Sequence, residues 1–495
     1  MESPILTAAQ MREAEEAAFA RGVAVEALMD QAGVGVARAV SRFFPNPGKC
    51  VVFAGKGHNG GDALVAAKCL KQTGWKVDLR LAFPESDCSE LTRKKLQELR
   101  SAAQNSSVAT HLASPLVVLD GVLGLGATKI LREPVRSCVI EINRLRAEQN
   151  AFVFAVDLPT GLGGDSGELG PDCVIADCTV TIGFAKCGLL EDAALDNVGR
   201  LEVVPLPDLA LDQNARNEIV ATGHSLRSLL PRRQFSAYKN QFKRIGVVAG
   251  SKGFVGAALM TTRGALLAGA GLVEVFVPEQ IYPIVAASAP PEAMIKPVRS
   301  YRLLLEHEID VLALGPGLGF DERADILRLI ERHERPIIVD ADGLNILSDR
   351  IDILRNCRGA RLLTPHPGEM RRLLDPGRMS RAATARHFCE QFPVTLLFKG
   401  SRTIVAERGR PLSFNTTGNP GMASGGMGDV LTGVCAGLFG QKLPLYDAAR
   451  LGAWVCGRAA EIATFNGHAS EQSLLATNVL DHLGDAFNDL QDSVS

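Results

Sequence analysis

Apolar runs alternate with helix-patterned stretches along two successive blocks of the chain. In the first block, a helix-patterned region over residues 7–44 precedes the apolar runs, and helical stretches such as 61–73 and 135–149 separate several of them. Short apolar runs of this kind are typical of strands buried on both faces of a parallel sheet. The predicted strands are CVVFAG (50–55), KVDLRLAF (76–83), LVVLDGVLG (116–124), AFVFAVDLP (151–159), CTVTIGF (178–184) and RLEVVPL (200–206).

The second block begins near Ser225, after a less apolar stretch (207–223) without strong periodicity, where we place the domain boundary. Its last three apolar runs are short and are joined by tight turns, which predicts antiparallel, hairpin-like pairing. The runs are RIGVVAG (244–250), GLVEVFVP (271–278), VLALGPG (311–317), PIIVDADG (336–343) and RLLTPHPG (361–368), followed by the hairpin-like VTLLFKG (394–400), TIVAER (403–408) and PLSFN (411–415).

Composition narrows the class of protein. A chain of 495 residues exceeds one typical core, and 46% hydrophobic with 22% charged residues is ordinary for a soluble globular protein. The net charge of -2 argues against a nucleic-acid partner. The N-terminus lacks a basic flank followed by an apolar run, and no run reaches the roughly 18 apolar residues that a membrane span needs. We expect neither a secretory signal nor a membrane partner.

The 11 cysteines are scattered, and none forms a C-x-x-C pair. A zinc site or a disulfide framework is therefore not expected, and reduced thiols indicate a cytoplasmic protein.

Glycines and polar residues gather where three predicted strands of the first block end. The first strand leads through GKGHNGGDA (55–63) into a helix, Asp120 stands beside the glycine-rich GVLGLGATK, and Asp157 precedes LPTGLGGDSG. Ligands bind outside the carboxyl ends of the strands in open α/β sheets, and glycines there let the backbone approach a ligand closely. The three ends together predict one binding site.

The oxygen atoms at these ends suit a hard cation. Asn59, Asp120 and Thr160 supply amide, carboxylate and hydroxyl oxygens, which are ligands for an alkali or alkaline-earth ion. The plainer alternative is a strand-to-helix turn in which Asn59 or Asp62 merely caps the helix.

The first 210 or so residues resemble the NAD(P)H-hydrate epimerase domain, because LTAAQMREAE, GHNGGDALVAAKCL, LDGVLGLGA and AVDLPTGL occur in the order of that family. The resemblance implies a K⁺ ion held by Asn59, Asp120 and Thr160, and we expect Asp157 to relay protons in catalysis. It implies hydrate contacts from His58, Asn59, Gly60, Gly61, Asp62, Gly124, Leu125, Gly126, Ala127, Thr128, Lys129, Ile130 and Asp157.

Three positions depart from that family's pattern. The family usually has Asn-Asn-Gly-Gly-Asp-Gly, where this chain has His58 and Ala63. It usually has Ser at the position of Thr160, which keeps the hydroxyl. It tends to have Arg in the loop where this chain offers Lys129 or Arg132.

A glycine-rich loop opens an apolar helix in the second block. Residues 416–441 read TTGNPGMASGGMGDVLTGVCAGLFGQ, with six glycines between 418 and 433 and Asp429 at the start of the helix. Successive N–H groups of such a loop can wrap a phosphate at the positive end of a helix. An acid beside them can act as general base on a hydroxyl, and the alternative is that Asp429 only caps the helix.

This loop resembles the glycine-glycine-x-glycine-Asp segment of the ribokinase-like fold. AGSKGFVGAALMTTRGALLAGAGLVEV, LGPGLG, VDADGLNIL, LTPHPGEM and FKGSRTIV are similar to the NAD(P)H-hydrate dehydratase branch, over nearly all of 225–490. The position of His366 before Pro367 also predicts a helix with proline in its first turn. The resemblance implies hydrate contacts from Ala257 or Ala258, Gly317, His366 and Asp429, and nucleotide contacts from Lys399, Gly400, Ser401, Arg402, Thr403 and Gly428.

The two resemblances together predict an α/β chain of two domains. A Rossmann-like, three-layer parallel sheet domain over residues 1–213 would be the epimerase. A ribokinase-like α/β domain over residues 222–490 would be an ADP-dependent dehydratase, because fused chains of this family resemble ADP users. The expected function is repair of hydrated NADH and NADPH: the R and S hydrates interconvert, and the S hydrate is dehydrated.

A kinase-like site suits dehydration because hydroxide is a poor leaving group. Phosphoryl transfer to the hydroxyl, with Mg²⁺ shielding the charge and Asp429 as base, would be followed by loss of phosphate. Two alternatives remain: a ribokinase-type small-molecule kinase, and an N-terminal domain that is a non-catalytic binding module. The expected partners are the two hydrates and an adenine nucleotide, with the protein as a homo-oligomer.

Overall fold

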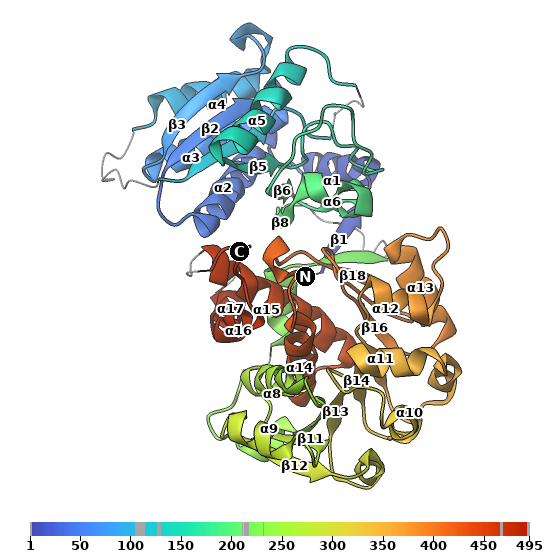
Figure 1. Ribbon diagram of the computed structural model, residues 1–495. Coiled ribbons are helices and arrows are strands. Elements are labelled where there is room, and N and C mark those ends of the chain that lie inside the picture. Colours follow the sequence, from blue (N-terminus) through green and yellow to red (C-terminus); the bar gives the residue numbers. More distant parts are fainter. Residues whose placement is uncertain are drawn as a thin grey trace. The chain divides into compact units, whose positions relative to one another are not determined.

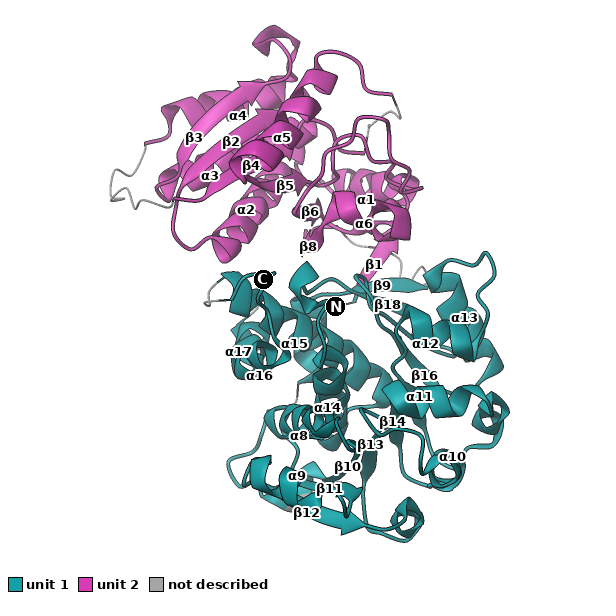
Figure 2. Cartoon of the chain, in the orientation of Figure 1, with its two compact units in different colours: residues 1–2, 217–495 teal, residues 3–216 magenta. Residues whose placement is uncertain are grey.

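The chain forms two compact units in the computed structural model, which describes residues 2–103, 114–125, 130–209, 211, 217–230, 232–465 and 469–492. One unit spans residues 3–216, and the other spans residues 1–2 and 217–495 (Figure 2). Each unit carries its own sheet of mostly parallel strands and its own helices (Figure 1). The α/β class expected from the sequence is confirmed.

The N-terminal unit has a six-stranded sheet in the order β3-β2-β4-β5-β6-β8. All neighbouring strands are parallel, and the middle strands are buried along their length, as their continuous apolar runs predict. A further parallel pair joins β1 to β7. The strands are β1 (Ser3–Leu6), β2 (Lys49–Ala54), β3 (Lys76–Leu81), β4 (Leu116–Gly121), β5 (Phe152–Val156), β6 (Cys178–Ile182), β7 (Ala185–Lys186) and β8 (Arg200–Val204).

Helices cover both faces of this sheet, which gives three layers. On one face of β4, a side chain at Gly121 would overlap Ala63 of α3. On the other face, Val118 belongs to the same apolar cluster as Val139 and Ile142 of α5. Successive strand residues point to opposite faces, so α3 and α5 lie on opposite sides. The helices are α1 (Ala8–Ala20), α2 (Val25–Phe43), α3 (His58–Gln72), α4 (Glu90–Ser101), α5 (Val135–Gln149) and α6 (Leu195–Val198).

The sheet of the C-terminal unit runs in the order β12-β11-β10-β13-β14-β15-β16-β17-β18-β9. Its pairs are parallel except β16–β17 and β17–β18, which confirms the antiparallel pairing predicted for the last three runs. The strands are β9 (Glu218–Ala221), β10 (Arg244–Val248), β11 (Leu272–Pro278), β12 (Ala293–Val298), β13 (Val311–Leu314), β14 (Ile337–Val339), β15 (Arg361–Leu363), β16 (Thr395–Phe398), β17 (Ile404–Glu407) and β18 (Leu412–Asn415).

Close contact between α8 and α14 places the glycine-rich loop at the carboxyl ends of the central strands. A side chain at Gly433 would overlap the carbonyl oxygen of Thr261, and one at Gly264 would lie 2.6 Å from the carbonyl oxygen of Val430. The helices are α7 (Gly223–Leu226), α8 (Val255–Leu267), α9 (Tyr282–Ser288), α10 (Arg323–Arg332), α11 (Ala341–Ser348), α12 (Pro367–Leu373), α13 (Arg381–Gln391), α14 (Met427–Gly440), α15 (Leu445–Phe465), α16 (Ala476–Asp481) and α17 (Leu483–Asp492).

Four strands were not expected from the sequence: β1, β7, β9 and β12. β9 lies in the stretch 207–223, which shows no strong periodicity, and it pairs with β18 in the C-terminal unit. β12 carries Lys296 and Pro297 and pairs with β11 at the edge of the sheet. In the described part of the chain, no helix is both long and apolar enough to cross a membrane.

The α8–α14 contact makes a prediction about stability. Gly433→Ala would push a methyl group into the backbone of α8, so we expect the C-terminal unit to lose about 1–3 kcal/mol of unfolding free energy. Gly484→Ala in α17 is the control, because an added methyl there meets nothing within 4 Å. Calorimetry compares the two variants with the parent, and an unchanged melting temperature for Gly433→Ala would contradict the close helix contact.

Candidate active sites

The glycine-rich loop of the C-terminal unit ends at Gly426, which is the N-cap of α14. Its φ of 89° is left-handed, and a side chain there would overlap the Met260 sulfur, so only glycine fits. The cap receives no side-chain hydrogen bond. Asp429 lies in the first turn of the helix and therefore does not cap it. The capping alternative for Asp429 is wrong.

A buried ion pair lies beside this helix start. Asp340 follows β14 and is 1% exposed, and its Oδ1 accepts a 2.6 Å hydrogen bond from Lys399 Nζ. Its Oδ2 accepts from Thr432 Oγ1 of α14 at 2.8 Å. Burial alone would raise the pKa of Asp340, but Lys399, Thr364 and Thr432 hold it below its ordinary value. Asp340 is therefore an ionised anchor for the lysine.

The position of Asp340 was not singled out from the sequence as a site residue. It ends an apolar strand as Asp120 and Asp157 do, and the same rule applied to PIIVDADG would have found it. Lys399 Nζ also lies 3.8 Å from Glu369 Oε2. A Cβ built at Gly428 would lie 3.3 Å from the same lysine nitrogen. The predicted nucleotide residues Lys399 and Gly428 are thus brought together at the start of α14.

Asp429 is suited to take a proton near neutral pH. Within the described residues its carboxyl makes no hydrogen bond or salt bridge, and it is half-buried. Burial raises its pKa to about 6, the charges of Asp340 and Asp342 add to the rise, and Lys399 opposes it. A free carboxylate with a pKa of this size is the expected form of a general base.

The predicted hydrate contacts of this unit lie on a loop and at the starts of helices. Gly317 has a φ of 57°, and a Cβ there would lie 2.9 Å from the Cβ of Ala257. Ala257 is half-buried beside Gly317, whereas Ala258 is fully buried in the apolar core. Ala257 is therefore the better placed of the two to meet a ligand.

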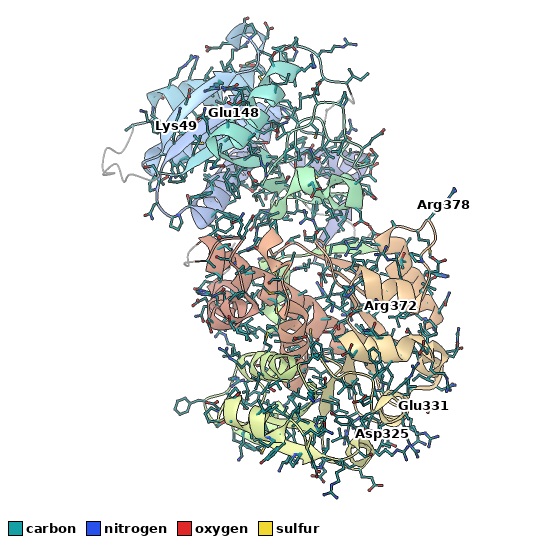
Figure 3. The ribbon with its side chains drawn as sticks, viewed as in Figure 1. Lys49, Glu148, Asp325, Glu331, Arg372 and Arg378 are labelled. Atoms are coloured by element: carbon teal, nitrogen blue, oxygen red, sulfur yellow. The ribbon has the colours of Figure 1, made fainter. Side chains whose placement is uncertain are left out.

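His366 is the N-cap of α12, and Pro367 occupies the first turn, as the sequence predicts. Its Nδ1 accepts from the N–H of Gly368 at 2.9 Å, and its ring is half-exposed. Arg372 of the same helix, labelled in Figure 3, donates to Asn345 Oδ1 of α11 at 2.8 Å. The cap thus fixes the His366 ring, and its Nε2 lies 3.4 Å from Glu369 Oε1.

Arg381 shapes the rest of the predicted nucleotide loop. Its Nη2 donates to the carbonyl oxygens of Lys399 at 3.2 Å and Arg402 at 3.1 Å, and Thr403 Oγ1 donates to the carbonyl oxygen of Gly400 at 3.1 Å. Arg402 is buried and Ser401 is exposed. The sequence analysis missed Arg381, because it lies in a separate helix with no motif around it.

In the N-terminal unit, Asp120 and Thr160 are brought together and are fully buried. Asp120 Oδ1 accepts from Thr160 Oγ1 at 2.7 Å, and Oδ2 accepts from the Thr160 N–H at 2.8 Å. Burial raises the pKa of Asp120 to about 6, although the hydrogen bonds from Thr160 and the N–H of Val122 oppose the rise.

Asn59 completes this group. Both polar atoms of its amide are buried and have no hydrogen-bond partner among the described residues, and a Cβ at Gly124 would lie 3.4 Å from its Oδ1. A buried amide without partners is costly, and it indicates a ligand that the structure does not contain. The N-cap of α3 is Gly57 without a side-chain bond, so neither Asn59 nor Asp62 caps the helix. The three residues fit a hard cation such as K⁺.

Asp157 lies apart from that group, in a different set of contacts. Its φ of 68° is left-handed, and its Oδ1 accepts from Lys186 Nζ and from the Ile182 N–H at 3.1 Å. Lys186 is fully buried in β7. The sequence analysis missed it, because one lysine after an apolar run has no distinguishing pattern.

The remaining predicted residues of this unit are unevenly placed. His58 and Ile130 are exposed, Gly60 and Gly61 are buried in α3, and Leu125 lies 3.4 Å from a Cβ built at Gly164. Four of the predicted residues lie outside the described part of the chain: Gly126, Ala127, Thr128 and Lys129.

No group of three His, Cys, Asp or Glu in the described residues can hold a metal ion by itself. Mg²⁺ in nucleotide enzymes is usually bound by one or two carboxylates, by phosphates and by water. The carboxylates of Asp340, Glu369 and Asp429 lie close enough to Lys399 to raise the pKa of its ammonium group. They are the carboxylates that would bind such an ion.

The comparisons with known proteins match each unit of the chain to a family. Residues 245–483 match the family described as NAD(P)H-hydrate dehydratase, and residues 25–188 match the YjeF-related protein N-terminus. The bifunctional NAD(P)H-hydrate repair enzyme Nnr of Moorella thermoacetica is 33% identical, over 99% of this chain and 98% of that one. That of Escherichia coli is 33% identical, over 94% of this chain and 90% of that one.

Among solved structures, the ADP/ATP-dependent NAD(P)H-hydrate dehydratase from Bacillus subtilis, co-crystallised with ATP and Mg²⁺, is 26% identical with a TM-score of 0.48. The similarity covers 56% of this chain and 100% of the Bacillus subtilis chain. The two units and their sites define a two-domain α/β enzyme. The chain belongs to the family of bifunctional NAD(P)H-hydrate repair enzymes, which confirms the family expected from the sequence.

The environment of Asp429 makes a prediction about pH. If its carboxylate takes the hydroxyl proton, the dehydration rate should fall as the pH is lowered through about 6. Asp429→Asn should lose about 10²-fold or more of the rate at every pH. A variant with near-parent turnover would contradict the assignment as base.

The stability of the same variant supplies the control. A carboxyl group whose pKa is raised on folding destabilises the fold once it is ionised. Asp429→Asn removes that penalty, so its melting temperature should equal the parent's below pH 4 and exceed it above pH 6. Parallel melting curves at the two pH values test this sign.

Proposed function

We propose that this enzyme repairs hydrated NADH and NADPH in two steps. The domain over residues 1–213 interconverts the R and S hydrates, and the domain over residues 222–490 dehydrates the S hydrate at the expense of ADP. The division of the chain at residue 216 supports this assignment. The observation that carries the dehydratase is the unbonded carboxyl of Asp429 between a glycine-rich loop and the Lys399–Asp340 pair.

Dehydration follows from that arrangement. Asp429 takes the proton of the hydroxyl, and the oxygen attacks the terminal phosphorus of ADP, which releases AMP. Lys399, held by Asp340, and the N–H groups before α14 stabilise the negative charge of the transferred group. Phosphate then leaves, and loss of a proton from the neighbouring carbon restores the ring double bond. Mg²⁺ bound with the nucleotide would neutralise phosphoryl charge.

Ligand binding can be assigned residue by residue in this unit. Ala257, Gly317 and His366 would hold the hydrate at the loops beside Asp429. The hydrogen bonds from Arg381 that fix the loop after Lys399 support its assignment to nucleotide binding. That loop and the helix start would contact the nucleotide through Lys399, Gly400, Ser401, Arg402, Thr403 and Gly428.

The epimerase site lies at the carboxyl ends of β2, β4 and β5. Asn59, Asp120 and Thr160 would hold K⁺, which would orient the nucleotide and stay outside the bond-making steps. The buried amide of Asn59 without a partner supports this ligand set. An enzyme that dehydrates only one epimer leaves the other unrepaired, so an epimerase in the same chain makes both available.

None of the eleven cysteines forms a disulfide, which supports a reducing compartment such as the cytoplasm. We also propose a homo-oligomer, which light scattering of the full chain would measure.

The nucleotide can be tested directly. With ADP and Mg²⁺, the S hydrate should be consumed, NAD(P)H should appear and no phosphorylated product should accumulate, whereas ATP should serve poorly. Absorbance of the dihydronicotinamide band and chromatography measure both. Turnover with ATP alone would overturn the choice of ADP, and accumulation of a phosphorylated product would favour a small-molecule kinase.

The cation makes a separate prediction. Replacing K⁺ by Li⁺, or Asn59 by Ala, should raise the KM for epimerisation about 10-fold before kcat falls, because the cation binds the substrate and does no chemistry. Rates of R to S conversion without nucleotide provide the measurement. An unchanged KM in K⁺-free buffer would show that these three residues do not form a potassium site.

A further inference from the structure

Two carboxyl groups of the N-terminal unit have opposite environments. The Oδ1 atom of Asp157 accepts three hydrogen bonds, from Lys186 Nζ, from Thr181 Oγ1 at 3.3 Å and from the Ile182 N–H at 3.1 Å. The carboxyl of Asp62, in the second turn of α3, makes no hydrogen bond or salt bridge with any described residue. One carboxyl is fixed and the other is free to meet a substrate.

Lys186 fixes Asp157 through a complete set of donors. Its side chain is 1% exposed, and besides Asp157 it donates to the Ile182 carbonyl oxygen at 2.9 Å and to Thr181 Oγ1 at 3.2 Å. All three ammonium protons are engaged, so the lysine has none to offer a ligand. The contacts reach Oδ1 only, which leaves Oδ2 of Asp157 as the oxygen available for chemistry.

Asp62 is a carboxyl whose environment favours the protonated form. Burial raises the pKa of Asp62 well above its ordinary value, the negative charges of Asp157 and Glu15 add to the rise, and Lys186 opposes it. Glu15, on α1, has its own pKa raised by burial. Pairs of carboxyl groups whose environments differ in this way are typical of acid and base partners in catalysis.

The chemistry of epimerisation needs such a pair. Hydration of a dihydropyridine places the hydroxyl on a ring carbon next to the nitrogen, because that carbon is the electrophilic end of the protonated enamine. Its configuration can invert if the C–O bond breaks, with the nitrogen lone pair forming an iminium ion. Water then adds to the other face. The first step needs an acid at the hydroxyl, and the second needs a base at the incoming water.

We propose that Asp62 is the general acid of the epimerase and that Asp157, positioned by Lys186, is its general base. The proposal rests on the epimerase function argued above. The Asp62 carboxyl protonates the hydroxyl, the C–O electrons leave with water, and the nitrogen lone pair forms the C=N bond. A second water attacks the same carbon and gives its proton to Asp157 Oδ2, while the C=N electrons return to nitrogen. Exchange with solvent moves the proton from Asp157 to Asp62, and nothing is oxidised.

The experiment uses the full chain, pure R hydrate and no nucleotide, so that only epimerisation proceeds. Chromatography that resolves the epimers follows S hydrate, and the uncatalysed rate is subtracted. Asp62→Asn should lower kcat about 10²-fold or more with little change in KM. Glu13→Gln, which removes an exposed carboxylate from the same helix as Glu15, should match the parent. Parent-like kcat in Asp62→Asn would overturn the acid role.

Lys186 is tested by its effect on the pH profile. Lys186→Met leaves Asp157 facing Asp62 and Glu15 without a counter-charge, so the acid limb of the rate should move up by at least one pH unit. Lys186→Arg, which keeps the charge, should leave the limb close to the parent's. A purely structural lysine would lower the rate equally at every pH, and that result would overturn the positioning role.

Two further readouts separate this proposal from the proposed function. Parent protein that does not interconvert the epimers would refute the epimerase itself. In parent protein that does, hydrate carrying ¹⁸O in the hydroxyl should lose one label for each inversion, and retention of the label would overturn acid catalysis at the hydroxyl. Dehydration of S hydrate with ADP shows that the C-terminal unit of each variant is folded, and melting curves of the full chain show that the N-terminal unit is folded.

Discussion

A carboxylate buried at the end of a parallel strand must find new partners, because the strand ladder has ended and water is excluded. Asp120, Asp157 and Asp340 all occupy such positions, and each is satisfied differently. Asp120 accepts from Thr160, Asp157 from Lys186, and Asp340 from Lys399. These three carboxylates and their hydrogen-bond donors form the polar centres of the two units.

The free carboxyls gain their character from the paired ones. Asp429 lies beside the Lys399–Asp340 pair, and Asp62 interacts with the Lys186–Asp157 pair. In each unit, an ammonium group binds one carboxylate, and burial together with the charge of that carboxylate raises the pKa of a second carboxyl that has no hydrogen-bond partner among the described residues. The raised pKa favours the protonated form of the second carboxyl, which suits it to proton transfer in the function proposed for each unit.

Glycine makes the C-terminal arrangement possible. The α8–α14 approach depends on Gly264 and Gly433, and the start of α14 depends on the left-handed Gly426. These positions bring Asp429 to the sheet edge where Asp340 and Lys399 lie. A larger residue at any of them would move Asp429 away from Asp340 and Lys399, so packing and the proposed catalysis are linked through the same helix.

The sequence by itself determined the elements whose pattern is local. Continuous apolar runs predicted the central strands, the glycine-rich loop located Asp429, and the motif after the first strand located Asn59. Each of these signals comes from neighbouring residues, and burial on both faces of a sheet imposes it directly on the chain.

Only the tertiary structure decided which distant residues meet. β9 forms by pairing with β18. Lys186 donates a hydrogen bond to Asp157, which lies 29 residues earlier in the chain. Lys399 and Asp340 are 59 residues apart and form one ion pair. Such partners carry no local pattern, because their contact energy is gained only after the sheet has brought the strand ends together.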